Sequence, residues 1–330
     1  MSAITTKTHA FSKSGEPNIG GLALVVCPTP AHLHYWVDRF KTKVRSSNYT
    51  WSARSCFRSD NSASALALCR IRPSATQLTA PVRILLVSDL HYSLPQLDWV
   101  VGAAPAFDLV VVAGDSLSIR SAVSLDAQSV VMLRYLSLLQ AAGQVAVSSG
   151  NHDLTGPDEH GEQGALWLTE AKAMGIPTDN DSLIVGDTVV TICPWWDGPA
   201  GKAAVAAQLA SDAARRGRLW LWVYHWPPLG SPTCWTGRRD YGDADLGGWI
   251  DEFRPDAVLT GHVHESPFKA DGSWVDRIGD TWVFNAGHQI GPVPARIELD
   301  FTQGRATWLS LLGTEELNLD ASAAPERSVF

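Results

Sequence analysis

Side chains of types that often bind metal ions follow five apolar runs of this 330-residue chain. In the order of the five runs they are Asp89 and His91; Asp115; Asn151, His152 and Asp153; His225; and His262 and His264. Carboxylate oxygens and imidazole nitrogens are common ligands of divalent cations in proteins. Histidine also exchanges protons near neutral pH. The residue types therefore predict metal-ion and acid–base chemistry, provided that the fold brings the five places together.

The apolar runs explain how these side chains can meet. The first three lie in segments 81–92, 107–116 and 144–153, and each ends in a small or polar residue. Short runs of branched aliphatic residues between turn signals are typical of buried strands. Open α/β sheets build their sites at the carboxyl ends of such strands. We therefore expect an α/β fold with the candidate ligands along one edge of the sheet.

Read in order, the run ends contain D-x-H, G-D, G-N-H-D, a lone His and G-H-x-H. This set resembles the calcineurin-like metallophosphoesterase superfamily over roughly residues 81–310. A single G-D pair occurs by chance, but five motifs in this order, each after a strand-like run, are specific. The resemblance implies a four-layer αββα sandwich of two mixed sheets, with a small N-terminal α/β appendage outside it.

The resemblance also implies two divalent metal ions, drawn from Mn²⁺, Fe²⁺, Zn²⁺ or Co²⁺. The first ion would be held by Asp89, His91 and His264, the second by Asn151, His225 and His262, and Asp115 would bridge them. Residues i and i+2 of an extended segment point to the same side, so Asp89 and His91 can reach one ion. His262 and His264 can serve different ions only if the chain turns sharply after Gly261.

In the superfamily, the histidine at the position of His152 contacts the phosphate and can protonate the leaving oxygen. We expect Asp153 to accept a hydrogen bond from the ring of His152 and to fix its tautomer. With two metals supplying a hydroxide near neutral pH, the resemblance implies hydrolysis of a phosphoester.

The motif spellings narrow the substrate class. Protein Ser/Thr phosphatases of the superfamily usually contain G-D-x-V-D-R-G and G-N-H-E, whereas this chain contains GDSLSIR and GNHD. The GNHD form is similar to that of phosphodiesterases, nucleases and small-molecule phosphatases. We therefore expect a phosphodiesterase. The alternatives are a nuclease, a small-molecule phosphomonoesterase, or a scaffold without activity, which the complete ligand set disfavours.

Charge is distributed unevenly. Residues 1–80 contain 10 Lys and Arg against 3 Asp and Glu, whereas the remainder contains 16 against 31. An acidic catalytic part opposes the approach of a long polyanion unless the basic module binds it. A small phosphoester, which can contain a nucleotide, is therefore the expected substrate. The basic module is either a docking surface for an anionic partner or an ordinary solvated face.

Four further residues are candidates for substrate binding. Trp195, Trp196 and Trp226 lie beside the expected site and could stack on a nucleobase. Core packing is the alternative for each, since the chain has 14 tryptophans. His288, in FNAGHQ, follows a late strand and is a candidate at the rim.

We expect four segments along the chain. They are a disordered stretch 1–18, a small basic α/β module 19–80, a catalytic domain 81–315 and a loose tail 316–330. In the module we expect strands at 20–27, 48–57 and 63–71 and a helix at 30–44. In the catalytic domain we expect helices at 94–103, 125–142, 164–174, 202–216 and 246–253, a hairpin at 182–193, and strands at 274–278, 281–285, 295–300 and 305–311.

Cysteine usage and hydropathy bear on location. The five cysteines are scattered without a C-x-x-C pair, which a reducing compartment permits, and no apolar run approaches the ~18 residues of a membrane span. We therefore expect a cytoplasmic protein without a transmembrane segment. A lipoprotein signal ending at LVVC and a transit peptide in the basic N-terminal part are the alternatives.

Overall fold

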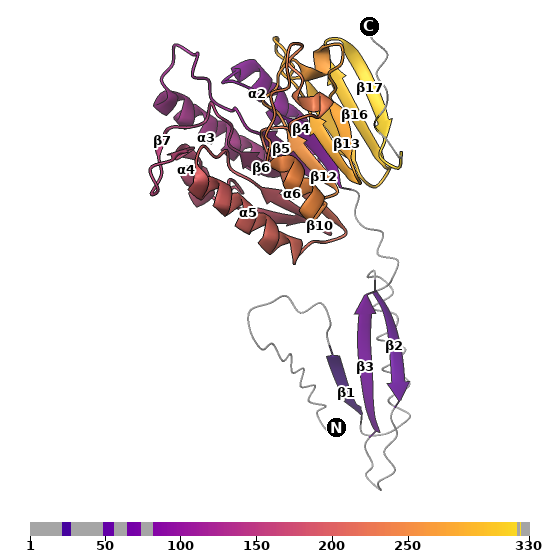
Figure 1. Cartoon of the computed structure of the whole chain (residues 1–330). Coiled ribbons are helices and arrows are strands. Elements are labelled where there is room, and N and C mark those ends of the chain that lie inside the picture. Colours follow the sequence, from indigo (N-terminus) through magenta and orange to yellow (C-terminus); the bar gives the residue numbers. More distant parts are fainter. Residues whose placement is uncertain (1–21, 28–48, 56–64, 74–81, 322–323, 325–330) are drawn as a thin grey trace. The chain divides into compact units, whose positions relative to one another are not determined.

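The computed structural model describes residues 22–27, 49–55, 65–73, 82–321 and 324 (Figure 1). The chain divides into two compact units, residues 1–78 and residues 79–330. No helix among the described residues is long and apolar enough to cross a membrane.

The described part of the N-terminal unit is a three-stranded antiparallel sheet. Its strands are β1 (Leu22–Cys27), β2 (Tyr49–Ser55) and β3 (Ala65–Pro73), in the order β1-β3-β2. All three overlap the segments for which the sequence predicts strands. The expected helix at 30–44 and the expected disordered stretch 1–18 lie outside the described residues.

The second unit contains two six-stranded mixed sheets. The first has the order β17-β16-β15-β4-β5-β6, in which the neighbours β4–β5 and β5–β6 pair in parallel and the other neighbours pair antiparallel. Its strands are β4 (Arg83–Val87), β5 (Leu109–Ala113), β6 (Gln144–Ser148), β15 (Arg296–Asp300), β16 (Arg305–Ser310) and β17 (Gly313–Asn318).

The second sheet has the order β13-β14-β12-β11-β10-β9. Its four central strands are parallel, and the two edge strands are antiparallel to their neighbours. Its strands are β9 (Ser182–Val185), β10 (Thr188–Ile192), β11 (Leu219–Val223), β12 (Ala257–Thr260), β13 (Val275–Ile278) and β14 (Thr281–Asn285). A short hairpin, β7 (Gly156–Pro157) and β8 (Gln163–Gly164), stands apart from both sheets.

Alternation of side chains along the strands builds the layers. In β4, Ile84 and Leu86 pack into the core between the sheets, whereas Leu85 and Val87 pack under the helices. In β11, Leu221 belongs to the core between the sheets. This two-residue period follows from the pleat of a strand whose two faces are both buried.

Helices cover the outer face of each sheet (Figure 1). The helices α2 (Leu94–Ala103), α3 (Leu125–Ala142) and α4 (Trp167–Ala173) pack on the first sheet. The helices α5 (Pro199–Ala213) and α6 (Leu246–Phe253) pack on the second. The expected α/β fold, a four-layer αββα arrangement of two mixed sheets, is confirmed.

Several boundaries differ from the expected ones. Helix α4 begins at Trp167 rather than at residue 164, because Gln163 and Gly164 pair with β7 as strand β8, and α5 ends at Ala213 rather than at residue 216. Helix α5 begins at Pro199 rather than at residue 202, because proline is well suited to the first position of a helix. The boundary expected at residue 315 falls within β17, which pairs with β16 as far as Asn318. The loose tail therefore cannot begin before the end of this strand.

Candidate metal centre

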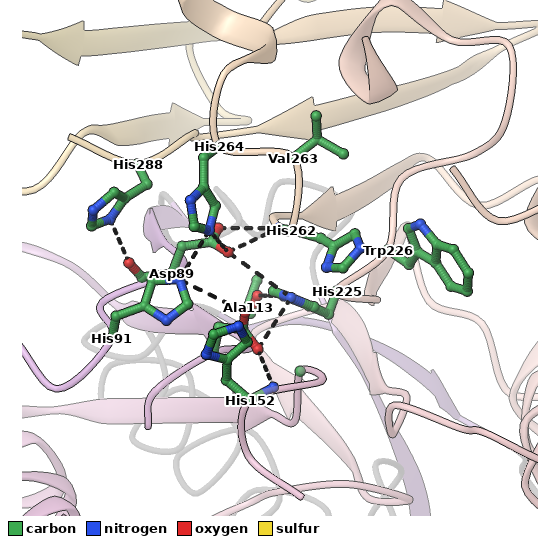
Figure 2. Close-up of polar contacts among 12 residues, drawn as sticks. Asp89, His91, Ala113, His152, His225, Trp226, His262, Val263, His264 and His288 are labelled. Atoms are coloured by element: carbon green, nitrogen blue, oxygen red, sulfur yellow. Dashed lines mark hydrogen bonds and ion pairs between the residues drawn. The ribbon is translucent and has the colours of Figure 1, made fainter. Parts of the chain in front are cut away.

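The candidate ligands meet at the carboxyl ends of parallel strands from both sheets. Asp89 and His91 follow β4, Asp115 follows β5, His225 follows β11 and His264 follows β12. Figure 2 shows the side chains of Asp89, His91, His225 and His264 pointing toward one another. The edge predicted from the apolar runs is therefore the place where the side chains converge.

The first group of potential ligands contains Asp89, His91, Asp115 and His264, whose ligand atoms all lie within 4.8 Å of one another. The Nε2 atom of His264 lies 3.2 Å from Asp89 Oδ1 and 2.9 Å from His91 Nε2. Two ligands on neighbouring positions around an ion at ~2.1 Å stand about 3 Å apart, so this spacing fits one cation.

The second group contains Asp115, His225 and His262 and meets the same 4.8 Å limit. The Nε2 atom of His225 lies 3.5 Å from Asp115 Oδ1. Asp115 belongs to both groups, because its other oxygen lies 3.8 Å from the Nε2 atom of His91. The carboxylate therefore has the position of a bridge.

Unsatisfied polar atoms test whether these residues fit a metal ion. Asn151 Oδ1, His225 Nε2 and His262 Nε2 are buried and have no hydrogen-bond partner within the described part of the chain. An unpaired buried polar atom costs about 1–3 kcal/mol. These three atoms are the ligand atoms expected for the second ion, so the donor set fits a divalent cation.

Hydrogen bonds to backbone carbonyls orient two of the rings. His225 Nδ1 lies 2.6 Å from Ala113 O, and His91 Nδ1 lies 3.3 Å from Leu117 O. A carbonyl only accepts, so each Nδ1 carries a proton, and in the neutral ring Nε2 presents a lone pair toward the centre. This is the tautomer that a metal-binding histidine needs.

The backbone at the ligands is unusual. Asp89, His91, Asp115 and His262 have φ angles of 54°, 44°, 53° and 66°, in the left-handed region that non-glycine residues rarely adopt. Such conformations cluster at functional sites, where the surroundings enforce them. The candidate ligands at this edge are therefore held in strained backbone conformations that the surrounding structure enforces.

These angles correct one sequence argument. Asp89 and His91 do reach the same group, but not because they alternate along an extended segment. Their backbone N–H groups donate to Gly114 O and Asp115 O at 3.1 and 2.9 Å, which winds the segment beside the end of β5. The sharp turn expected after Gly261 is present, since His262 is left-handed and its N–H donates to Asp89.

Both carboxylates are held in their charged forms. Burial raises the pKa of Asp89, but the imidazoles of His264, His225 and His91 together outweigh it and lower the pKa below its usual value. Burial likewise raises the pKa of Asp115, but the imidazoles of His225 and His91 together lower it below its usual value. Charged carboxylates are the forms that bind cations.

The imidazoles divide into two classes. Burial lowers the pKa of His91 to about 4 and that of His262 to about 3, so both rings are neutral at pH 7. Burial also lowers the pKa of His225, but the carboxylates of Asp115 and Asp89, with the hydrogen bond to Ala113 O, together outweigh it and raise the pKa to about 9. Without a cation, a proton on His225 thus balances part of the negative charge.

Asp153 does not have the expected role. Its buried carboxylate accepts hydrogen bonds from the backbone N–H groups of Ser116, Leu117 and Gly150, at 3.2, 2.9 and 2.8 Å. Asp153 therefore ties the loop after β5 to the loop after β6. The expectation that it orients the ring of His152 is wrong, because Nδ1 of that ring lies 3.4 Å from the N–H of Ile119.

Two of the three tryptophans flank the second group. Trp195 stacks on Trp226 with ring centroids 4.9 Å apart, and the two centroids lie 5.1 and 5.5 Å from that of His262. Trp196 lies outside this cluster, because its indole N–H donates to the Tyr224 hydroxyl at 2.7 Å. Trp195 and Trp196 also line a neighbouring cavity of about 350 Å³.

Two more side chains lie against the ligands. The His288 ring centroid is 4.9 Å from that of His264, so His288 lies beside a candidate ligand, at the rim of the site. Tyr241, which the sequence did not single out, has its ring centroid 5.0 Å from that of His262. It lies in a polar loop without an apolar run or a metal-binding motif, so no signal in the sequence could have found it.

Comparisons with known proteins agree with this geometry. The family model described as calcineurin-like phosphoesterase matches residues 82–266, which contain every candidate ligand. This chain belongs to that family. No curated protein matches the chain.

Several solved structures match this chain at low sequence identity. One is TT1561 of Thermus thermophilus, with 16% identity and a TM-score of 0.46, covering 73% of this chain and 100% of that chain. Another is the purple acid phosphatase PPD1 from yellow lupin (Lupinus luteus) seeds, with 11% identity and a TM-score of 0.48, covering 93% of this chain and 69% of that chain. Yfce, a phosphoesterase from E. coli, has 14% identity and a TM-score of 0.38, covering 72% of this chain and 100% of that chain.

Proposed function

We propose that this protein is a phosphodiesterase that uses two divalent cations. The observation that carries the proposal is the pair of buried, unpaired atoms His225 Nε2 and His262 Nε2 beside the Asp115 carboxylate, which belongs to both ligand groups. Asn151 Oδ1, from the G-N-H-D motif, is also buried and unpaired among the described residues. Asp89, His91 and His264 would hold one cation, Asn151, His225 and His262 the other, with Asp115 between them. The mixed N and O donors suit Mn²⁺, Fe²⁺, Zn²⁺ or Co²⁺.

When bound, two cations would neutralise the phosphoryl oxygens and lower the pKa of water toward neutrality. The protein's own contact with the leaving oxygen comes from His152. Its Nδ1 accepts from the N–H of Ile119, so the proton of the neutral ring lies on Nε2, where it can donate a hydrogen bond to the phosphate or the leaving oxygen and stabilise the charge that develops there. The backbone N–H of His152 donates to Asp115 Oδ1 at 2.8 Å, which fixes the ring beside the first group.

The surroundings favour a diester over a monoester. Trp195, Trp226 and Tyr241 stand beside His262 on one side of the centre, and His288 stands beside His264 on the other. A diester carries two alcohol groups. One of them could contact the aromatic rings beside His262, and the other could contact His288. The flat indoles suit an aromatic arm such as a nucleobase.

Charge and thiols support a small substrate in a reducing compartment. The acidic part that follows residue 80 opposes a long polyanion, which disfavours a nuclease unless the basic N-terminal module carries the nucleic acid. Cys193 and Cys234 are buried free thiols. This agrees with a cytoplasmic location, where thiols stay reduced.

The experiment that tests the proposal compares bis(4-nitrophenyl) phosphate with 4-nitrophenyl phosphate, with Mn²⁺ and after chelation. We expect metal-dependent hydrolysis with a preference for the diester. Preference for the monoester would make the protein a small-molecule phosphatase. Bound metal without turnover of either compound would leave a selective nuclease or an inactive scaffold.

A further inference from the structure

His288 is a second imidazole beside the candidate ligands that belongs to neither ligand group. Its ring centroid lies 4.9 Å from that of His264 and 5.4 Å from that of His91. Figure 2 shows His288 and His152 on different sides of the His91 ring. Among the described residues, the groups with gathered ligand atoms do not include His288.

One hydrogen bond fixes the tautomer of this ring. His288 Nδ1 lies 2.7 Å from the backbone carbonyl oxygen of Asp89. A carbonyl cannot donate, so Nδ1 carries the proton and Nε2 of the neutral ring is an acceptor. His152 has the opposite tautomer, because its Nδ1 accepts from the N–H of Ile119. The two rings therefore offer a donor on one side of the centre and an acceptor on the other.

The loop that carries His288 is held in place. The Asn285 side chain, fully buried at the end of β14, donates to Val263 O at 3.0 Å and accepts from the N–H of Gly287 at 2.9 Å. The N–H of His288 itself donates to His264 O at 3.2 Å. The Asn285 amide thus joins the loop of His264 to the loop of His288, which holds the His288 imidazole in place beside the candidate ligands.

We propose that His288 is a specificity-determining residue whose Nε2 accepts a hydrogen bond from a hydroxyl on the alcohol arm of the substrate. A phosphodiester anion has no proton to donate, so the donor must belong to the arm itself. Because the ring adjoins the first ligand group, the hydroxyl has to be close to the phosphorus. The favoured substrates are therefore phosphoesters of vicinal diols, such as a glycerol or a ribose. This inference rests on the proposed function.

Binding of phosphonates tests the inference without turnover, because their carbon–phosphorus bond is not hydrolysed. The full chain loaded with Mn²⁺ is titrated calorimetrically with 2-hydroxyethylphosphonate and with propylphosphonate. In propylphosphonate a methyl group of similar size replaces the hydroxyl, which removes the donor. One net hydrogen bond predicts about three- to tenfold tighter binding of the hydroxyl compound. Equal affinities, or no binding of either compound, would overturn the inference.

Variants assign the preference to the ring. His288→Phe keeps a flat ring without the acceptor, and the ratio of the two affinities should fall to about one. His160→Phe is the matched control at an exposed histidine, and it should keep the wild-type ratio. If the phenylalanine variant does not fold, His288→Leu serves instead. A wild-type ratio in the folded variant would also overturn the inference, whereas a retained preference without turnover of any diester would refute only the proposed function.

Discussion

At the scale of single residues, the two oxygens of Asp115 face different partners. Oδ2 lies toward His91, and Oδ1 lies toward His225 and accepts from the N–H of His152. A carboxylate in this position can serve two cations, whereas an amide has one oxygen and no charge. The side chain therefore couples the two ligand groups.

Asp115→Asn should weaken the binding of both metals by at least tenfold and remove most activity. The charge that offsets the cations is lost, and the amide nitrogen would face one group. Metal content after gel filtration, measured by mass spectrometry, checks this. Asp280→Asn is the matched control, since Asp280 is 96% exposed. Two tightly bound metals in the Asp115 variant would contradict the bridging role.

His152→Ala should retain both metals and lose about 10²–10⁴-fold in kcat. The ring is proposed to donate a hydrogen bond to the phosphate or the leaving oxygen, and it lies outside the two ligand groups. Single-turnover kinetics together with metal analysis separate these effects. Loss of a metal from this variant would mean that His152 is a ligand, and unchanged kcat would exclude the proposed contact with the leaving oxygen.

Much of the site could be predicted because five motifs place ligands after buried runs. The two groups correspond to the expected sets as far as their aspartates and histidines are concerned. Contacts between a side chain and residues distant in the sequence could not be predicted. Asp153 binds backbone N–H groups of another loop, and Tyr241 approaches His262 from a polar segment. Neither relation leaves a periodic signal in the sequence.

At the scale of elements, glycines before the ligands let loops approach closely. A Cβ atom on Gly150 would overlap a carboxylate oxygen of Asp115 and lie 2.7 Å from His225 Nε2 and 2.6 Å from the backbone nitrogen of Asp115. The loops after β5 and β6 therefore touch at a point where no side chain fits. This gives a physical reason for glycine in the G-N-H-D motif.

Gly150→Ala should destabilise the protein by about 1–3 kcal/mol and weaken metal binding, because the methyl group displaces Asp115 or His225. Gly102→Ala in α2 is the matched control, since nothing lies within 4 Å of the added atom, and it should be neutral or slightly stabilising. Urea unfolding with and without Mn²⁺ checks both variants. Equal midpoints for the two alanines would refute the steric argument.

The elements themselves were predicted where both faces of a strand are buried. Strand β17 was missed because it lies at a sheet edge and buries only Leu317 among mostly polar residues, so it has no apolar run. The left-handed turns at Asp89 and Asp115 were also missed, because glycine is the residue that indicates such a conformation in a sequence and neither position is a glycine. Their cause is contact between loops, which is a tertiary effect.

At the scale of the whole molecule, the centre joins the two sheets. Asp89 and Asp115 follow strands of the first sheet, whereas His225, His262 and His264 follow strands of the second. Cations bound between them would cross-link the two halves of the sandwich. Metal binding should therefore contribute to global stability as well as to chemistry.

Chelation should lower the melting temperature of the full chain by about 5–10 °C. A ligand that binds only the folded state at 100 times its Kd stabilises it by ~2.7 kcal/mol, and in a domain of this size each kcal/mol corresponds to about 2–4 °C. Calorimetric scans with saturating Mn²⁺ and with excess chelator measure the difference. Asp115→Asn should show a smaller difference between the two conditions, because it binds both metals more weakly. If the wild-type protein melts identically with and without metal, then either the cations do not bind or they do not connect the sheets, and metal analysis of the same samples distinguishes the two.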